Sequence, residues 1–290
     1  MGLRHPHYND ALNTNAVAAN IAKPIDFVEI HAENFFAEGG ISQALLHDVA
    51  EQYQVSVHGT SLGLGSGMPV PKRVLQKFAK VVAHSKAFLV SEHLCFNRVA
   101  YNEQVLHTGD LLPVPYNEHS LETICSHIHQ VQDALKRPIL IENLSAYLLP
   151  SELDEMAQDS MSEISFLVSM ANRSGCGLLL DINNMIVNAI NQNVSNVVEH
   201  VFNNVAQLPA HLIGEIHLAG FSHNTVNGFI VDDHANAVSE QCWELYAKII
   251  ALVGHKPTLI EWDNQLPEWH VLVGEATKAK NINRTMQTST

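Results

Sequence analysis

The chain alternates between short apolar runs and longer amphipathic stretches. The apolar runs begin near positions 27, 55, 88, 139, 178, 214, 229 and 258. Between most of them apolar residues recur at helical spacing, as in PKRVLQKFAKVVA over Pro71–Ala83. Strands that alternate with helices predict parallel strands joined by crossover helices. The other helices that the spacing predicts span His119–Leu135, Glu163–Asn172, Val194–Leu208 and Ser239–Val253.

The apolar runs are rich in Val, Ile and Leu on both faces, which is typical of a buried parallel sheet. A chain of 290 residues, 46% of them hydrophobic, suits one α/β barrel. We therefore expect a single TIM-type (β/α)8 domain over residues 1–276. The polar stretch 277–290 is expected to be a flexible C-terminal tail. Residues Tyr101–Ser120 look like a long loop that could serve as a lid or a substrate wall.

Each apolar run ends on, or just before, a side chain that commonly binds metals. In a parallel barrel the carboxyl ends of all strands meet at one mouth, so these residues would form one cluster. One such ending is readily explained as a cap or a hydrogen-bonding residue. Eight together favour metal binding, because buried carboxylates without compensation are costly. The endings are His31, His58, His93, Glu142, Asp181, His217, His234 and Glu261.

The spacing refines this cluster to nine candidate ligands. Asn184 lies three residues after Asp181 and could reach the same centre, and Asp232 and His234 share one face of an extended segment. His31 is not retained, and the sequence leaves open which of Glu92 and His93 points inward. Glu142 and Glu261 could each bridge two ions. The candidate ligands are His58, His93, Glu142, Asp181, Asn184, His217, Asp232, His234 and Glu261.

Nine ligands exceed the four to six that one ion takes, and they fit two or three ions with open positions. Histidine and carboxylate without cysteine suit iron, manganese or zinc. The glycine-rich segment Gly59–Gly67 lacks the lysine of a phosphate loop, so a flexible loop beside the substrate is favoured. Arg4 and His7 either fold over the mouth or belong to a polar terminus. Cys95 beside His93 is interpreted as a buried bystander rather than a reactive thiol.

Composition narrows the partners and the compartment. The formal charge of −14 argues against binding to nucleic acid, which requires many cationic contacts, and against an anionic membrane surface. No run approaches the length of a membrane span, and the N-terminus MGLRHPHYND lacks the apolar stretch of a signal peptide. The four cysteines lie far apart without a CxxC motif, which predicts free thiols and a cytoplasmic protein.

Nearly the whole chain, from Gly2 to about Ala276, resembles the multinuclear non-haem iron-dependent oxidative enzymes, a family that includes the iron oxygenase of methanobactin biosynthesis. The motifs that carry the resemblance are GLRHPHYNDAL, FVEIHAENFF, SVHGTSLGLGS, SEHLCF, LIENLSAY, LLLDINN, GEIHLAG, VDDH and LIEWDNQLP.

The resemblance implies a xylose-isomerase-like TIM barrel with two or three irons of mixed Fe(II)/Fe(III) state and O2 as co-substrate. Other divalent metals could occupy the site in purified protein. It implies a cysteine-containing, ribosomally made precursor peptide as substrate and a separate protein that delivers it. The ligand pattern of the family falls on the same nine positions. Glu33 and Asn34 match a segment near the site, and with Arg4 and His7 they are candidates for contacts with substrate or ligands.

Two other interpretations stay open at this point. A divalent-metal sugar isomerase or a phosphodiesterase on a similar barrel also uses His, Asp and Glu at its strand ends. A non-catalytic metal-binding protein is the alternative of another class, and oxygen consumption would discriminate against it.

Overall fold

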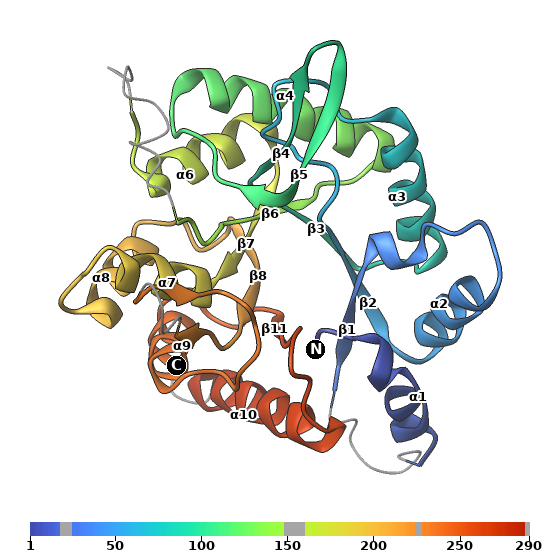
Figure 1. The fold of residues 1–290 in the computed structure, drawn as a ribbon. Helices are drawn as coiled ribbons and strands as arrows, with labels where there is room; N and C mark the ends of the chain where they lie inside the picture. Colours follow the sequence, from blue (N-terminus) through green and yellow to red (C-terminus); the bar gives the residue numbers. More distant parts are fainter. Residues whose placement is uncertain (18–24, 148–159, 224–227, 288–290) are drawn as a thin grey trace.

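Seven parallel strands form the main sheet of the computed structural model, which describes residues 1–17, 25–147, 160–223 and 228–287 (Figure 1). The sheet curls into a nearly closed barrel, with helices on its outside. The predicted α/β barrel is therefore confirmed, and seven of the eight predicted runs lie in its wall. In sheet order the strands are β1 (Phe27–His31), β2 (Gln54–Gly59), β3 (Leu89–His93), β6 (Leu140–Glu142), β7 (Gly177–Asp181), β8 (Ile213–Leu218) and β11 (Thr258–Ile260).

The N-terminal segment lies between the two ends of this sheet. The Gly2 N–H donates to the carbonyl of Ile260 at 2.9 Å, and the Leu3 N–H donates to the carbonyl of Glu29 at 2.8 Å. Gly2 also pairs with Glu29 as a parallel bridge. Residues from β11 and β1 are thus joined through this short extended piece, which takes the place of an eighth strand.

The run at 229 does not join the barrel, so the prediction of eight strand runs in one sheet is wrong at this position. It forms β10 (Ile230–Val231), which pairs antiparallel with β9 (Ser222–His223). Phe229 is 44% exposed. The segment after β8 is too short to hold a crossover helix, so the run cannot return as a parallel strand.

Helices α3 (Lys72–His84), α4 (Glu118–Leu135), α6 (Glu163–Ser174) and α9 (Glu240–Val253) confirm the predicted amphipathic stretches, and α8 (Val197–Val205) is shorter than its predicted range. Helices α1 (Tyr8–Val17), α2 (Ile41–Gln52), α7 (Ile182–Asn191) and α10 (Trp269–Gln287) were not predicted. Asparagine or serine side chains cap α4, α6, α8 and α9 by accepting from a backbone N–H in the first turn. The helices are η1 (His5–His7), α1 (Tyr8–Val17), η2 (Ala32–Phe35), α2 (Ile41–Gln52), α3 (Lys72–His84), α4 (Glu118–Leu135), α6 (Glu163–Ser174), α7 (Ile182–Asn191), α8 (Val197–Val205), α9 (Glu240–Val253) and α10 (Trp269–Gln287).

The expected flexible tail over 277–290 is corrected as far as Gln287, because α10 continues through it. Ala279 and Asn283 of this helix are buried, and the Asn283 amide donates to the hydroxyl of Tyr246 at 2.6 Å. One face of a mostly polar sequence therefore packs on α9 and β11. Residues 288–290 lie outside the described part of the chain.

The expected loop over Tyr101–Ser120 is mostly regular structure. Strand β4 (Phe96–Tyr101) pairs antiparallel with β5 (Gln104–Leu112), and α4 begins at Glu118. Asn102 and Glu103, at the turn, have φ of 46° and 62°, the positive values that tight hairpin turns require. Figure 1 shows this hairpin projecting from the barrel. Its role as a lid or a substrate wall stays a prediction.

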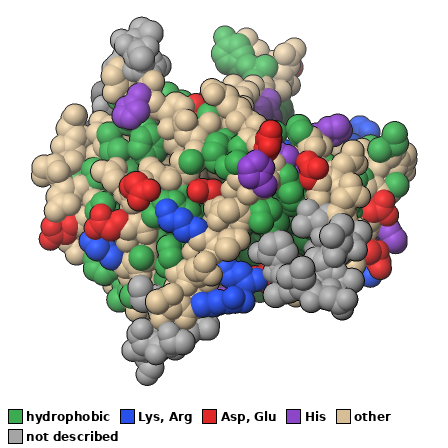
Figure 2. All heavy atoms as spheres, turned by 90° about the horizontal axis from the view of Figure 1, so that it is seen from below, with side chains coloured by type: hydrophobic (Ala, Val, Ile, Leu, Met, Phe, Trp, Pro, Cys, Tyr) green, Lys and Arg blue, Asp and Glu red, His purple; other side chains and the backbone are tan. Residues whose placement is uncertain are grey.

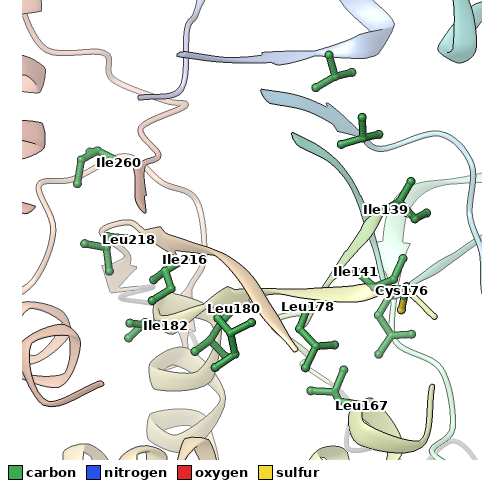
Figure 3. Packing of buried hydrophobic residues seen from close by; sticks show 14 of the residues in the cluster. Ile139, Ile141, Leu167, Cys176, Leu178, Leu180, Ile182, Ile216, Leu218 and Ile260 are labelled. Carbon is green, nitrogen blue, oxygen red and sulfur yellow. The ribbon is translucent and has the colours of Figure 1, made fainter. Parts of the chain in front are cut away.

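Side chains alternate between the two faces of the barrel strands, as the period of two requires. Leu178 and Leu180 of β7 lie on the outer face, where Leu178 is next to Leu167 of α6 (Figure 3). Asp181, at the end of the same strand, lies on the opposite, inner face. On the face of the molecule shown in Figure 2, acidic, basic and hydrophobic side chains are interspersed. Several of the acids are instead buried inside the barrel, among them Glu29, Glu142 and Asp181.

No helix in the described ranges is both long enough and apolar enough to cross a membrane.

Candidate metal centre

The strand register brings the predicted ligands to one level at the mouth of the barrel. His93 of β3 pairs with Glu142 of β6, and Asp181 of β7 pairs with His217 of β8. His58 is the last residue but one of β2. Because each side chain sits at an inward position near the carboxyl end of its strand, residues far apart in sequence meet there.

A first group consists of His58, His93 and Glu142. The two Nε2 atoms lie 3.3 Å apart, and Glu142 Oε2 lies 3.3 Å from His58 Nε2 and 3.4 Å from His93 Nε2. Ligand bonds of about 2.1 Å separate adjacent ligands of one ion by roughly 3.0–3.4 Å. The three edges of this triangle match that spacing, so the group fits a single cation.

The opposite ring nitrogens of these histidines have their own partners. His58 Nδ1 is 2.7 Å from the Ser91 hydroxyl, and His93 Nδ1 is 3.0 Å from the Gly59 carbonyl oxygen. These contacts direct both Nε2 atoms toward Glu142. Burial lowers the pKa of His93 to about 4 and, with the neighbouring His93, lowers that of His58 well below its usual value. Both imidazoles are therefore neutral near pH 7, the form that binds metals.

A second group joins Glu142 to Asp181, His217 and Glu261. His217 Nδ1 lies 3.0 Å from Glu261 Oε2 and 3.9 Å from Glu142 Oε1. The two oxygens of Glu142 thus face different groups, which is the arrangement that a bridging carboxylate requires. Burial acts to lower the pKa of His217, but Glu29 and Glu261 outweigh it and leave that pKa well above its usual value.

Several oxygens at the mouth make no hydrogen bond to any described residue. Asp181 Oδ1 caps α7 by accepting from the Asn184 N–H at 2.6 Å, and its Oδ2 is left without a partner. The Asn184 amide donates to the Asn143 carbonyl at 3.0 Å, which leaves its Oδ1 unpartnered, as is Glu142 Oε2. Buried oxygens normally have partners, so these three fit a site for cations.

The concentration of carboxylates changes their acidity. Burial raises the pKa of Glu142 well above its usual value and raises that of Asp181 to about 7. Burial also acts to raise the pKa of Glu261, but His234 and His217 outweigh it and hold that pKa well below its usual value. A bound cation would favour the ionised form of all three carboxyl groups.

Asp232 and His234 lie at the edge of these groups, after β10. His234 Nε2 is 2.8 Å from Asp232 Oδ1, and its Nδ1 is 3.7 Å from Glu261 Oε2. Asp232 Oδ2 also accepts from the Ser145 hydroxyl at 2.9 Å. The two residues therefore pair with each other and adjoin the second group. His234 has a φ of 47°, an uncommon value for a residue with a side chain.

Arg4 folds over the mouth, whereas His7 does not. The Arg4 guanidinium is 3.1 Å from His31 Nε2 and 3.3 Å from Glu261 Oε1, and it forms an ion pair with Asp263. His7 Nε2 lies 2.8 Å from the Pro267 carbonyl oxygen, just before α10.

The two candidates in the HAEN motif are placed by η2. Glu33 Oε1 accepts from the Thr60 N–H at 3.0 Å, which ties η2 to the glycine-rich loop. Asn34 is exposed on η2.

The sequence interpretation missed several polar residues around the ligands, one partly exposed and three fully buried. Asp263 lies beside Glu261 and groups with His31. Glu29, Ser56 and Glu215 lie deeper in the barrel and are fully buried. Each precedes His31, His58 or His217 by two residues. Because side chains two positions apart on a strand share a face, this spacing could have placed all three on the inner face of the barrel.

The four cysteines of the chain are buried and free. Burial raises the pKa of Cys95 well above its usual value, so its thiol is not activated. This agrees with its interpretation as a bystander.

Fold and site together define a parallel α/β barrel with a group of buried metal-type ligands at its mouth. The barrel resembles D-psicose 3-epimerase from Clostridium cellulolyticum, with a TM-score of 0.58 at 10% identity over 98% of this chain and 95% of that one. It also resembles endonuclease IV from Thermus thermophilus, with a TM-score of 0.53 at 11% identity over 100% and 98%. At such low identity these likenesses show the fold alone.

The sequence profile of the RiPP precursor modification enzyme MbnB/TglH/ChrH family matches residues 1–284, and the chain belongs to this family. It is 41% identical over 283 residues to a UPF0276 protein of Chromobacterium violaceum, which covers 97% of this chain and 93% of the relative. A UPF0276 protein of Caulobacter vibrioides is 36% identical over 290 residues, or 100% of this chain and 96% of the relative. The chain is therefore an enzyme of peptide modification, and its substrate is a peptide.

Proposed function

We propose that this protein is an iron- and O2-dependent enzyme that oxidises cysteine residues of a ribosomally made precursor peptide. The observation that carries the proposal is the sharing of Glu142. Its Oε2 belongs to the group with His58 and His93, and its Oε1 faces His217. A carboxylate placed between two ligand groups supports a multinuclear centre rather than a single ion.

The residues divide among two or three ions. His58, His93 and Glu142 would hold one, and Glu142, Asp181, His217 and Glu261 a second. Asn184, Asp232 and His234 would complete a third position. Bound iron would supply the redox chemistry with O2 that amino-acid side chains lack. The chain itself keeps His58 and His93 neutral by burial, and Arg4 offsets part of the negative charge at the mouth.

A cysteine in the substrate is part of this proposal. Thiolates bind iron well, yet the four cysteines of the chain are buried with free thiols, and no described ligand group includes one. A thiolate ligand would therefore come from the bound peptide. A separate protein that delivers this peptide is part of the proposal, as is a cytoplasmic location, which the free thiols support.

The proposal is tested by loading the protein anaerobically with Fe(II), adding a cysteine-containing precursor peptide encoded beside its gene, and admitting O2. Mass spectrometry of the peptide should show an oxidative mass change. A peptide with each Cys→Ser change, and reactions kept free of O2, should show none. Glu142→Gln should abolish the reaction, whereas Glu118→Gln, on the surface helix α4, should preserve it.

The same preparation separates the alternatives. Turnover of ketohexoses by the Mn(II)-loaded protein would favour the sugar-isomerase interpretation. Iron that binds without consumption of O2 in the presence of all candidate precursors would favour a non-catalytic metal-binding protein. Either result would contradict the proposed oxidation.

A further inference from the structure

A second layer of polar side chains lies in the barrel beneath the proposed ligands. Glu29 of β1, Ser56 of β2 and Glu215 of β8 are each 0% exposed. Neither carboxylate belongs to the nine candidate ligands. Fully buried carboxylates are rare without a partner or a purpose, so this layer needs an explanation.

The layer meets the ligand groups at His217. His217 Nδ1 points to the mouth, 3.0 Å from Glu261 Oε2, while its Nε2 points downward, 3.4 Å from Glu29 Oε2. Glu215 Oε1 is farther from the same nitrogen, at 4.0 Å. A neutral imidazole carries its proton on one nitrogen and binds a metal through the other. In the metal-free structure Nδ1 is hydrogen-bonded to Glu261, and Nε2 makes no hydrogen bond to a described residue. A cation on Nδ1 would leave the ring proton on Nε2, where Glu29 is the nearest carboxylate that can accept it.

Glu29 is itself held in place. It is the register partner of Ser56, whose hydroxyl donates to Glu29 Oε2 at 3.1 Å and lies 3.4 Å from Glu215 Oε2. The backbone of Glu29 is bonded on its other side, because Leu3 donates to its carbonyl and its own N–H donates to the carbonyl of Met1. The carboxylate thus stands on a strand that is fixed along both edges, where it can orient the ring precisely enough to position a ligand.

The other histidines at the mouth differ in this respect. His58 is backed by the hydroxyl of Ser91 and His93 by the carbonyl of Gly59, both of which are neutral. An anionic acceptor raises the basicity of the imidazole and fixes its orientation more strongly than a neutral one. The difference in backing predicts a stronger donor at His217 than at His58 or His93.

We propose that Glu29 is a positioning residue of the metal centre: through His217 Nε2 it sets the tautomer, orientation and basicity of the ligand nitrogen Nδ1. The inference rests on the proposed function, in that it requires a cation at the group of Glu142, Asp181, His217 and Glu261. It assigns to Glu29 no direct contact with metal or peptide.

The test is an anaerobic titration with Fe(II) of the wild type, Glu29→Gln, Glu29→Asp and the matched control Glu215→Gln. Glu215 shares the burial and the neighbourhood of Glu29 but lies farther from His217 Nε2. Glu29→Gln should weaken the binding of one ion by about 10- to 100-fold, and the ion at His58 and His93 should bind as before. Glu29→Asp should recover part of the affinity, and Glu215→Gln should change it less than about threefold.

Two further measurements separate positioning from a merely structural role. The Tm of metal-free Glu29→Gln should fall, because the variant loses the buried pair with His217, and the further rise in Tm on adding Fe(II) should also shrink. The d–d absorption of the Co(II)-loaded variant should shift, because one ligand has changed its donor strength. Equal losses in Glu29→Gln and Glu215→Gln, or an ion found between Glu29 and Glu215, would overturn the inference.

The outcome for the wild type is independent of these variants. A wild-type protein that binds no Fe(II) would refute the proposed function. A wild type that binds two or three ions, together with Glu29→Gln that binds them equally well, would refute only the role of Glu29.

Discussion

The two halves of the site, which meet at Glu142, differ in what stands behind their histidines. In the half formed by β2 and β3, the Nδ1 atoms of His58 and His93 contact a hydroxyl and a backbone carbonyl, which are both neutral. Burial lowers the pKa of both rings. In the half formed by β8 and the segment after β10, the Nε2 atoms of His217 and His234 face the carboxylates of Glu29 and Asp232. There Glu29 and Asp232 outweigh the effect of burial and hold the pKa of each ring well above its usual value.

The difference shows that the partner of one ring nitrogen decides whether a ligand histidine is neutral or protonated before a metal binds. The first half offers neutral nitrogens that are ready to bind a cation. The second half is more polar. Without a cation, its imidazolium and carboxylate groups form ion pairs with one another. A metal that enters the second half must displace protons from these pairs, so its binding there should release more protons.

The largest expected effect comes from Glu142→Gln, which removes the carboxylate shared by both halves. Iron bound per chain, measured by elemental analysis after anaerobic loading and desalting, should fall from two or three to one or none. The metal-free variant should gain stability, because burial raises the pKa of this carboxyl and an amide has no charge to bury. Glu118→Gln, in an exposed pair with Arg173, is the control and should keep the iron. Unchanged iron in Glu142→Gln would mean that the halves are independent.

The second effect concerns the free energy of unfolding of the metal-free protein. His217→Gln removes a buried imidazolium that faces Glu29 and Glu261, and breaking such a buried pair costs about 3 kcal/mol or more. His58→Gln removes a neutral ring and should cost about 1 kcal/mol. Urea unfolding at pH 7 measures both values. Equal costs in the two variants would contradict the contrast between the halves.

The third effect is a dependence on pH in the first half. The pKa of His93 is about 4 in the folded protein, against roughly 6.5 for an unperturbed histidine. Below pH 6.5 the unfolded chain binds a proton that the folded chain refuses until about pH 4, so the free energy of unfolding falls as the pH falls through this window. The contribution reaches about 3 kcal/mol at its largest.

His93→Gln should remove that contribution. Urea unfolding of the metal-free proteins between pH 7 and pH 4 should show a shallower acid loss in the variant than in the wild type. Parallel curves would show that His93 is not held neutral by burial.

The smallest effect is expected from Ser91→Ala, which removes the neutral acceptor behind His58. Anaerobic Fe(II) titration should show about a tenfold weaker ion in the first half, with the second half unchanged. The matched variant is Ser56→Ala, which removes the hydroxyl that donates to Glu29, and it should weaken the binding of the ion in the second half. A loss in the same half for both variants would break the comparison.

The sequence predicted the barrel well because buried parallel strands and amphipathic helices leave strong periodic patterns. It failed where tertiary context decides. The run at 229 is apolar like the others, but its connection is too short to return to the sheet, and the sparse apolar residues at Met1 and Leu3 give no strand pattern. The helix α7 was missed because Asp181, a predicted ligand, is also its N-cap.

The site shows the same division. Strand ends indicated His58, His93, Glu142, Asp181, His217 and Glu261, which the register does bring together. The placement of Asp232 and His234 depended on a hairpin that no periodicity predicts. Glu29, Ser56 and Glu215 were overlooked, since the runs were read as apolar on both faces, whereas their inward positions near the mouth are polar.

The most direct test of the account is anomalous diffraction at the iron edge from crystals of the anaerobically loaded protein. The account predicts at least two iron peaks at the mouth of the barrel, with the carboxylate of Glu142 contacting two of them and His217 binding through Nδ1. A single isolated ion, with Glu142 and Asp181 directed away from it, would contradict a shared multinuclear centre.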